Sequence, residues 1–130
     1  GVYNRIKRQL VYASAGHPPA ILISQSATSS AKVQQLKTPG MPVGMFPEAR
    51  YVDNCCDVED LSTLYIFSDG VYEIHQPDGN IWGLDPFIDL LAAYNGSTAD
   101  PLELVLSYVQ KLNAKAVFDD DWSLLKVDFG

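Results

Sequence analysis

The chain has 130 residues, a net charge of −7 and 47% apolar residues, which is enough apolar material for a packed core. This size fits one domain or a piece of one, and the start at Gly1-Val2-Tyr3 without Met favours a piece. The acidic balance, with no run of Lys or Arg, argues against binding to a nucleic-acid backbone. No signal peptide, membrane span or lipidation motif is recognisable, so we expect a cytoplasmic location with Cys55 and Cys56 as reduced thiols.

Two β-hairpins are predicted in the first third of the chain. Residues 2–4 and 9–14 are β-prone and flank a basic turn, and residues 19–24 and 32–37 form a second pair. Residues 25–31, rich in Ser, Thr and Ala, are expected to form a flexible loop in solvent.

A segment rich in Pro and Gly follows, and residues 38–48 are expected to form a structured loop. Four apolar side chains are expected to anchor it to the core: Met41, Val43, Met45 and Phe46. Strands are predicted over residues 51–58 and 63–68, the second of them buried because Leu64 to Phe67 is apolar throughout. Short turns between successive strands favour antiparallel sheets over βαβ units.

The last third of the chain predicts two helices and a strand. Asp85-Pro86 is read as an N-cap followed by the first helical residue, and Gly96 ends that helix. Asp100-Pro101 begins the second helix, and residues 122–129 read as a closing strand. The fold class is therefore α+β, with antiparallel sheets and two late helices packed on a sheet.

Two acidic sites flank apolar strands. Asp69 directly follows the predicted buried strand, and residues 119–121 are three consecutive aspartates before the closing strand. Asp-Gly is a common turn pair, and a solvated acidic run is equally ordinary. In an antiparallel pair of strands, however, Asp69 and Asp120 would be neighbours, and two carboxylates there would form half of a Mg²⁺ or Mn²⁺ site.

Five motifs occur in order along the chain: Tyr-Ala-Ser-Ala-Gly-His-Pro-Pro-Ala at 12–20, Gly-Met-Pro-Val-Gly at 40–44, Phe-Ser-Asp-Gly-Val-Tyr-Glu at 67–73, Trp-Gly-Leu at 82–84 and Asp-Asp-Trp-Ser-Leu-Leu at 120–125. Together they resemble the metal-dependent serine/threonine phosphatases of the SpoIIE/RsbU type, a bacterial branch of the type 2C (PPM) fold. The resemblance spans nearly the whole chain. It implies a type 2C-like β-sandwich with helices outside it, here incomplete.

The resemblance also implies a metal site. In this family the aspartate of the Asp-Gly motif and the first aspartate of a late acidic pair bind metal, and these positions are Asp69 and Asp120 here. The implied cofactor is Mn²⁺ or Mg²⁺, with two ions in a complete domain. Further candidates around the metal are Asp121, Gly70, Glu73 and His17. For His17 a structural role is favoured, because it lies between Gly and Pro turns.

One part of the family pattern has no counterpart. The aspartate that bridges two metals in such enzymes belongs to an early Gly-Asp motif, and nothing in residues 1–10 matches it. We therefore expect residues 1–130 to be the C-terminal part of a phosphatase domain, with negligible activity in isolation. No residue is assigned as a covalent catalyst, because metal-activated water attacks the phosphoryl group directly.

The resemblance further implies a phosphorylated protein substrate of the anti-anti-sigma type and an upstream sensor or receiver domain. Self-association is expected where an incomplete domain leaves apolar surface uncovered. The alternative function is a pseudophosphatase that binds a protein partner without catalysis, which the upstream sequence would distinguish from an enzyme.

Overall fold

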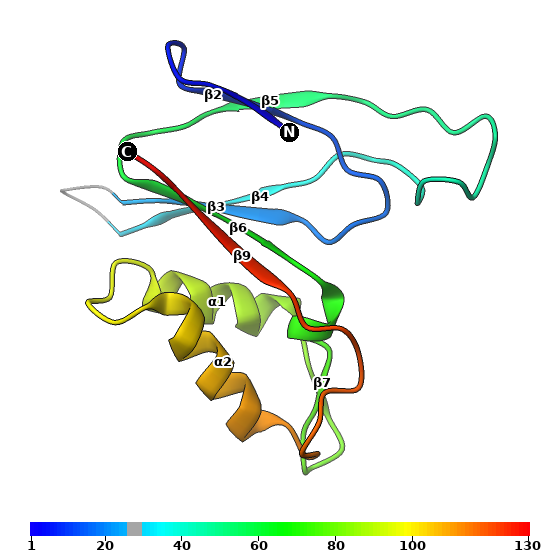
Figure 1. Ribbon diagram of the computed structural model, residues 1–130, viewed down its shortest axis with the longest axis vertical. Helices are drawn as coiled ribbons and strands as arrows, with labels where there is room; N and C mark the ends of the chain where they lie inside the picture. The colour runs from blue at the N-terminus through cyan, green and yellow to red at the C-terminus, as the bar shows by residue number, and fades with distance from the viewer. Residues whose placement is uncertain (26–29) are drawn as a thin grey trace. The chain divides into compact units, whose positions relative to one another are not determined.

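The computed structural model describes residues 1–25 and 30–130, so most of the loop predicted at 25–31 lies outside the described residues. The chain divides into two compact units. Unit 1 comprises residues 1–64 and 127–130, and unit 2 comprises residues 65–126. Antiparallel sheets and two α-helices make this an α+β fold, as the sequence predicts (Figure 1).

The first sheet of unit 1 has three antiparallel strands in the order β1-β2-β5. They are β1 (Val2–Asn4), β2 (Gln9–Tyr12) and β5 (Asn54–Asp57). Arg8, with a φ of 49°, ends the turn before β2. Its guanidinium donates hydrogen bonds to the carbonyls of Val58, Glu59 and Gly130. One cation therefore holds three backbone positions together.

The second sheet has the order β4-β3-β6-β9. Its members are β3 (Ala20–Ser24), β4 (Lys32–Leu36), β6 (Ser62–Phe67) and β9 (Leu124–Phe129). Ile21, Leu22 and Ile23 are all fully buried, and successive strand residues point to opposite faces, so both faces of β3 are covered. The Thr63 hydroxyl donates to the Asp128 carboxylate at 2.9 Å, which ties β6 to β9 within unit 1.

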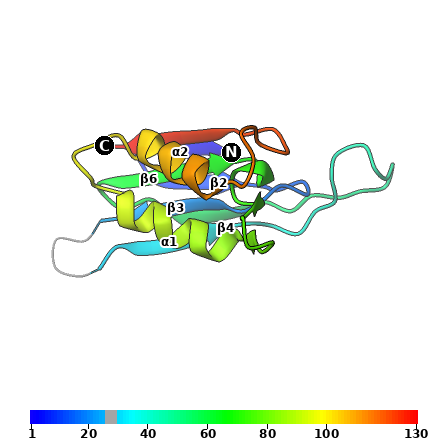
Figure 2. The same ribbon diagram turned by 90° about the horizontal axis from the view of Figure 1, so that it is seen from below.

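Unit 2 contains the end of β6, the start of β9 and the helices. A 3₁₀ turn, η1 (Asp69–Val71), follows β6 and leads into the short hairpin β7 (Ile74–His75) and β8 (Ile81–Trp82). The helices α1 (Leu84–Tyr94) and α2 (Pro101–Leu112) pack against each other (Figures 1 and 2). None of the helices in the described residues is long and apolar enough to cross a membrane.

An aromatic cluster forms the core of unit 2. Phe87 of α1 is fully buried and lies in edge contact with Phe67 of β6, with ring centroids 4.8 Å apart. Tyr72 and Trp82 complete the surroundings of the Phe87 ring, at 6.2 Å and 5.9 Å. A helix therefore packs on a strand of the sheet through this cluster, as the sequence predicts.

The two helix starts differ. Asp100 is the N-cap of α2, and its carboxylate accepts a hydrogen bond from the Leu102 amide at 3.0 Å, as predicted. The prediction for α1 is wrong: the helix begins at Leu84 with Gly83 as the N-cap, and Asp85 lies inside the first turn. Pro86 is tolerated there because the first helical amides have no carbonyl partner within the helix.

The apolar anchors predicted in residues 38–48 are also wrong. Four side chains are largely exposed: Met41 at 48%, Val43 at 79%, Met45 at 58% and Phe46 at 54%. Polar and backbone contacts hold the start of this segment instead. The Ser14 amide donates to the Thr38 hydroxyl at 2.6 Å, and the Gly16 amide donates to the Gly40 carbonyl at 2.9 Å. We call residues 38–52 the apolar loop.

Candidate metal centre

The candidate centre begins at the end of β6. Leu64, Tyr65 and Phe67 are buried, so the strand is fixed by its packing, and the chain emerges to solvent at Asp69. The amides of Tyr72 and Glu73 both donate to the Asp69 carbonyl, at 3.1 Å and 3.0 Å. These bonds wind η1 around Asp69 and leave its carboxylate exposed at a rigid position.

Ser68 attaches this turn to the acidic run. Its hydroxyl donates to the Asp121 carbonyl at 2.8 Å and accepts from the Ser123 amide at 2.9 Å. The Ser68 amide donates to the Ser123 carbonyl at 3.0 Å. These three bonds bring the Asp69 turn and the acidic run side by side, as expected if β6 and β9 are antiparallel neighbours (Figure 1). We call residues 68–70 together with 120–123 the acidic clamp.

Gly70 lets the two segments approach this closely. It is buried, and a Cβ built on it would overlap the Asp121 carbonyl group and lie 3.2 Å from the carbonyl carbon of Asp120. The Asp-Gly pair is therefore more than a turn signal, because the second residue must lack a side chain for the acidic run to pass beside it.

The two candidate ligands are arranged alike. Oδ1 of Asp69 accepts from the Gly70 amide at 3.0 Å, and Oδ1 of Asp120 accepts from the Asp121 amide at 2.7 Å. Within the described chain, no bond engages the Oδ2 atom of either carboxylate, and both residues are exposed. Each carboxylate is thus held on one side and open to a ligand on the other.

This donor set fits part of a hard-cation site. Carboxylate oxygens suit Mg²⁺ and Mn²⁺, which take about six oxygen ligands. Residues 1–25 and 30–130 hold no group of three or more His, Cys, Asp or Glu side chains that could hold a metal ion. Asp69 and Asp120 can therefore supply two ligands, and water or further groups must supply the others.

The other candidate residues have local contacts of their own. The Asp121 side chain is exposed, while its carbonyl is the acceptor for Ser68. Glu73 is exposed just after η1, and its amide helps to wind the turn. His17 lies in unit 1, where its Nδ1 donates to the Pro18 carbonyl at 2.9 Å. The roles predicted for these side chains remain predictions.

The first aspartate of the run has partners that the sequence analysis missed. Asp119 forms an ion pair with Lys115 through Oδ1, and its Oδ2 lies 3.1 Å from Nδ1 of His75, within hydrogen-bond distance. The hydrogen bond from the Lys115 ammonium, with a smaller contribution from His75, lowers the pKa of Asp119. Asp119 is exposed, as in a solvated acidic run, and its contacts with Lys115 and His75 come in addition to that exposure. The spacing of four from Lys115 was the available signal, whereas His75 lies 44 positions earlier, too far along the chain for a pattern to show.

Tyr72 directly follows the η1 turn that carries Asp69. Burial raises its pKa, and the nearby charges of Glu73 and Asp69 raise it further. The side chain therefore stays a neutral phenol at ordinary pH, and its ring packs against Phe67 and Phe87.

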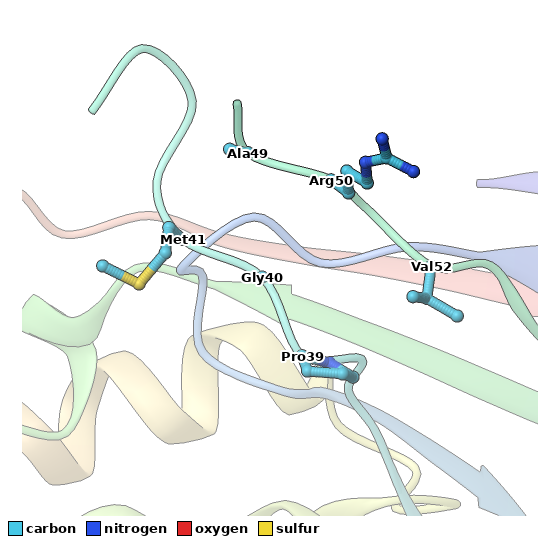
Figure 3. A pocket seen from close by; sticks show the side chains of 6 residues that line it. All are labelled: Pro39, Gly40, Met41, Ala49, Arg50 and Val52. Atoms are coloured by element: carbon cyan, nitrogen blue, oxygen red, sulfur yellow. The ribbon is translucent and has the colours of Figure 1, made fainter. Parts of the chain in front are cut away.

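A separate surface pocket of about 280 Å³ lies in the apolar loop (Figure 3). Its lining is mainly apolar with one cation: Pro39, Gly40, Met41, Ala49, Arg50 and Val52. None of the predicted metal-site residues lines it. Figure 3 shows the Met41 and Arg50 side chains extending in different directions from the backbone.

The fold is that of PP2C phosphatase domains. The SiaA PP2C domain of Pseudomonas aeruginosa superposes with a TM-score of 0.72 at 20% identity, covering 95% of this chain and 48% of that one. The phosphatase domain of the cell fate determinant SpoIIE from Bacillus subtilis gives a TM-score of 0.65 at 14% identity, covering 98% of this chain and 55% of that one.

The sequence itself matches the family model described as Stage II sporulation protein E (SpoIIE) over residues 1–130. The chain belongs to this family. It is also 22% identical to Protein IcfG of Synechocystis over 121 residues, which is 92% of this chain and 18% of IcfG. The chain thus spans about half of the solved phosphatase domains and less than a fifth of the curated relative.

Proposed function

We propose that this chain contributes two metal ligands, Asp69 and Asp120, to a metal-dependent serine/threonine phosphatase domain of which it forms the C-terminal part. The observation that supports this most directly is the set of three hydrogen bonds between Ser68 and residues Asp121 and Ser123, because they bring the two acidic segments together. The cation is Mn²⁺ or Mg²⁺, and a complete domain holds two.

The chemistry in the complete domain is hydrolysis of a phosphoserine or phosphothreonine. A bound divalent cation lowers the pKa of its water and neutralises charge on the phosphoryl oxygens. This chain's part is to hold two carboxylates at fixed positions, with one oxygen of each open to solvent. The proposed substrate is a phosphorylated regulator of the anti-anti-sigma type, with an upstream sensor or receiver domain as the control and the cytoplasm as the compartment.

Manganese-induced broadening of amide NMR signals tests the ligand assignment and detects weak binding. At low Mn²⁺, the signals of residues 69–71 and 120–122 should broaden before all others. Asp69→Asn and Asp120→Asn should each abolish this selectivity, while Asp89→Asn, an exposed carboxylate on α1, should leave it intact. Broadening spread evenly over the acidic surface would contradict the proposal.

Phosphatase activity provides a second measurement on the same proteins. We expect negligible turnover of a phosphoserine peptide with Mn²⁺, because two carboxylates cannot hold a two-metal centre alone. Robust turnover that Asp69→Asn abolishes would show that residues 1–130 suffice for catalysis.

A protein-binding role without catalysis is the second candidate. Two observations favour it. The described residues contain no group of three or more side chains that could hold a metal ion, and the apolar loop exposes several apolar side chains. Selective Mn²⁺ broadening at the acidic clamp would decide for the phosphatase, and its absence would decide for the adaptor.

A further inference from the structure

Asp119 joins two segments of unit 2 that are far apart in sequence. Its Oδ2 lies 3.1 Å from Nδ1 of His75, and its Oδ1 is paired with the Lys115 ammonium. The Ala114 amide donates to the His75 carbonyl at 2.9 Å. The loop between α2 and β9 is therefore attached to β7 by one backbone hydrogen bond and one side-chain contact.

These attachments continue the acidic clamp. Ser68 holds Asp121 and Ser123 on one side of Asp120, and His75 holds Asp119 on the other side. Ser68 and His75 also lie on opposite sides of Asp69 in the sequence. One continuous segment, residues 68–75, thus carries Asp69 and holds both flanks of Asp120.

A flexible ligand loses conformational entropy when a cation orders it, and a ligand fixed in advance does not. Asp120 itself is exposed and belongs to a loop without regular secondary structure. Its flanking attachments are therefore what limits its motion.

Resting on the proposed function, we propose that Asp119 is a positioning residue that fixes Asp120 for metal binding through its hydrogen-bond contact with His75. Its contribution to global stability is small. The side chains of His75, Asp119 and Lys115 are 52%, 38% and 61% exposed, and exposed ion pairs contribute little to folding. Changes at Asp119 or His75 should therefore alter the local loop and leave the fold intact.

Two variants separate positioning from simple charge attraction. Asp119→Ala removes a negative charge, which by itself weakens cation binding. His75→Ala removes no negative charge, so electrostatics alone predicts no loss of affinity. Positioning predicts a rise of about tenfold in the Mn²⁺ dissociation constant for both variants, in the range typical of outer-shell partners. Because both residues act through one contact, the double variant should show no further rise. Asp89→Asn is the matched charge control.

Hydrogen exchange of the Asp121 amide, measured without metal, gives a readout independent of binding. Both variants should speed this exchange several-fold, since that amide donates to the Asp120 carboxylate, while amides in α1 should keep their protection. His75→Ala could leave both the exchange rate and the Mn²⁺ affinity unchanged while broadening in the wild type stays selective for residues 69 and 120. That result would overturn the role of Asp119 and leave the proposed function standing. Loss of selective broadening in the wild type would overturn the proposed function and with it the role of Asp119.

Discussion

The acidic clamp and the apolar loop each contain a glycine against which a segment distant in sequence packs. The two regions differ in how much of their length is held by such contacts. In the clamp, contacts at Ser68 and Gly70 hold both ends of the 68–70 segment against residues 120–123. In the apolar loop, the contacts of Thr38 and Gly40 stop at the start, and a Cβ at Gly44 would meet nothing within 4 Å. The comparison shows that contacts hold the short polar turn at both of its ends, whereas they hold the longer apolar loop only where it begins.

The strongest test of this contrast compares two phenylalanines. Phe87 is fully buried in the cluster beneath the Asp69 turn, and Phe46 is 54% exposed in the apolar loop. Phe87→Ala should cost about 3–5 kcal/mol of unfolding free energy through the cavity that it leaves. Phe46→Ala should change it by less than about 0.5 kcal/mol. Urea denaturation monitored by circular dichroism measures both, and similar losses would show that the apolar loop is packed after all.

A smaller effect is expected where the clamp excludes a side chain. Gly70→Ala should cost about 3 kcal/mol, because its Cβ overlaps the Asp121 carbonyl and one backbone must move. Gly83→Ala, where a Cβ meets nothing within 4 Å, should cost less than about 1 kcal/mol. Equal stability of the two variants in thermal or urea unfolding would mean that Gly70 does not pack closely against the Asp121 carbonyl.

The smallest of the three effects concerns the Ser68 hydroxyl. Ser68→Ala removes one donor and one acceptor toward Asp121 and Ser123, and should cost about 1–2 kcal/mol. Ser123→Ala is the control, because its bonds to Ser68 come from the backbone and survive the change. Differential scanning calorimetry resolves the pair, and a loss in the control as large as in Ser68→Ala would remove the special role of the hydroxyl.

The sequence predicted the parts of the fold that local pattern determines. The two hairpins, the buried strand β6 and the start of α2 at Asp100 are confirmed, because strand alternation, turn residues and an N-cap all act within a few positions. The predicted start of α1 is wrong by two residues, since Gly83 and Asp85 are both acceptable N-caps and the pattern does not choose between them.

The site was predictable only in outline. That the Asp69 turn and the acidic run lie next to each other follows from the antiparallel pairing of two apolar strands. The structure brings these segments together. The metal roles of Asp69 and Asp120 remain predictions. The role of Ser68 was not predicted, because a hydroxyl that binds a segment 53 positions later leaves no local signal. The apolar side chains of residues 41–46 were misplaced because hydrophobicity alone does not say whether a partner surface exists.

The separation of 53 residues between Ser68 and Asp121 also has a kinetic meaning. Both helices and the β7–β8 hairpin lie in that interval, so the contact closes a long loop and we expect it to form late in folding. A cation that requires both carboxylates finds no partner in the unfolded chain and stabilises only the finished state. Such a cation is expected to slow unfolding while leaving the rate of folding nearly unchanged.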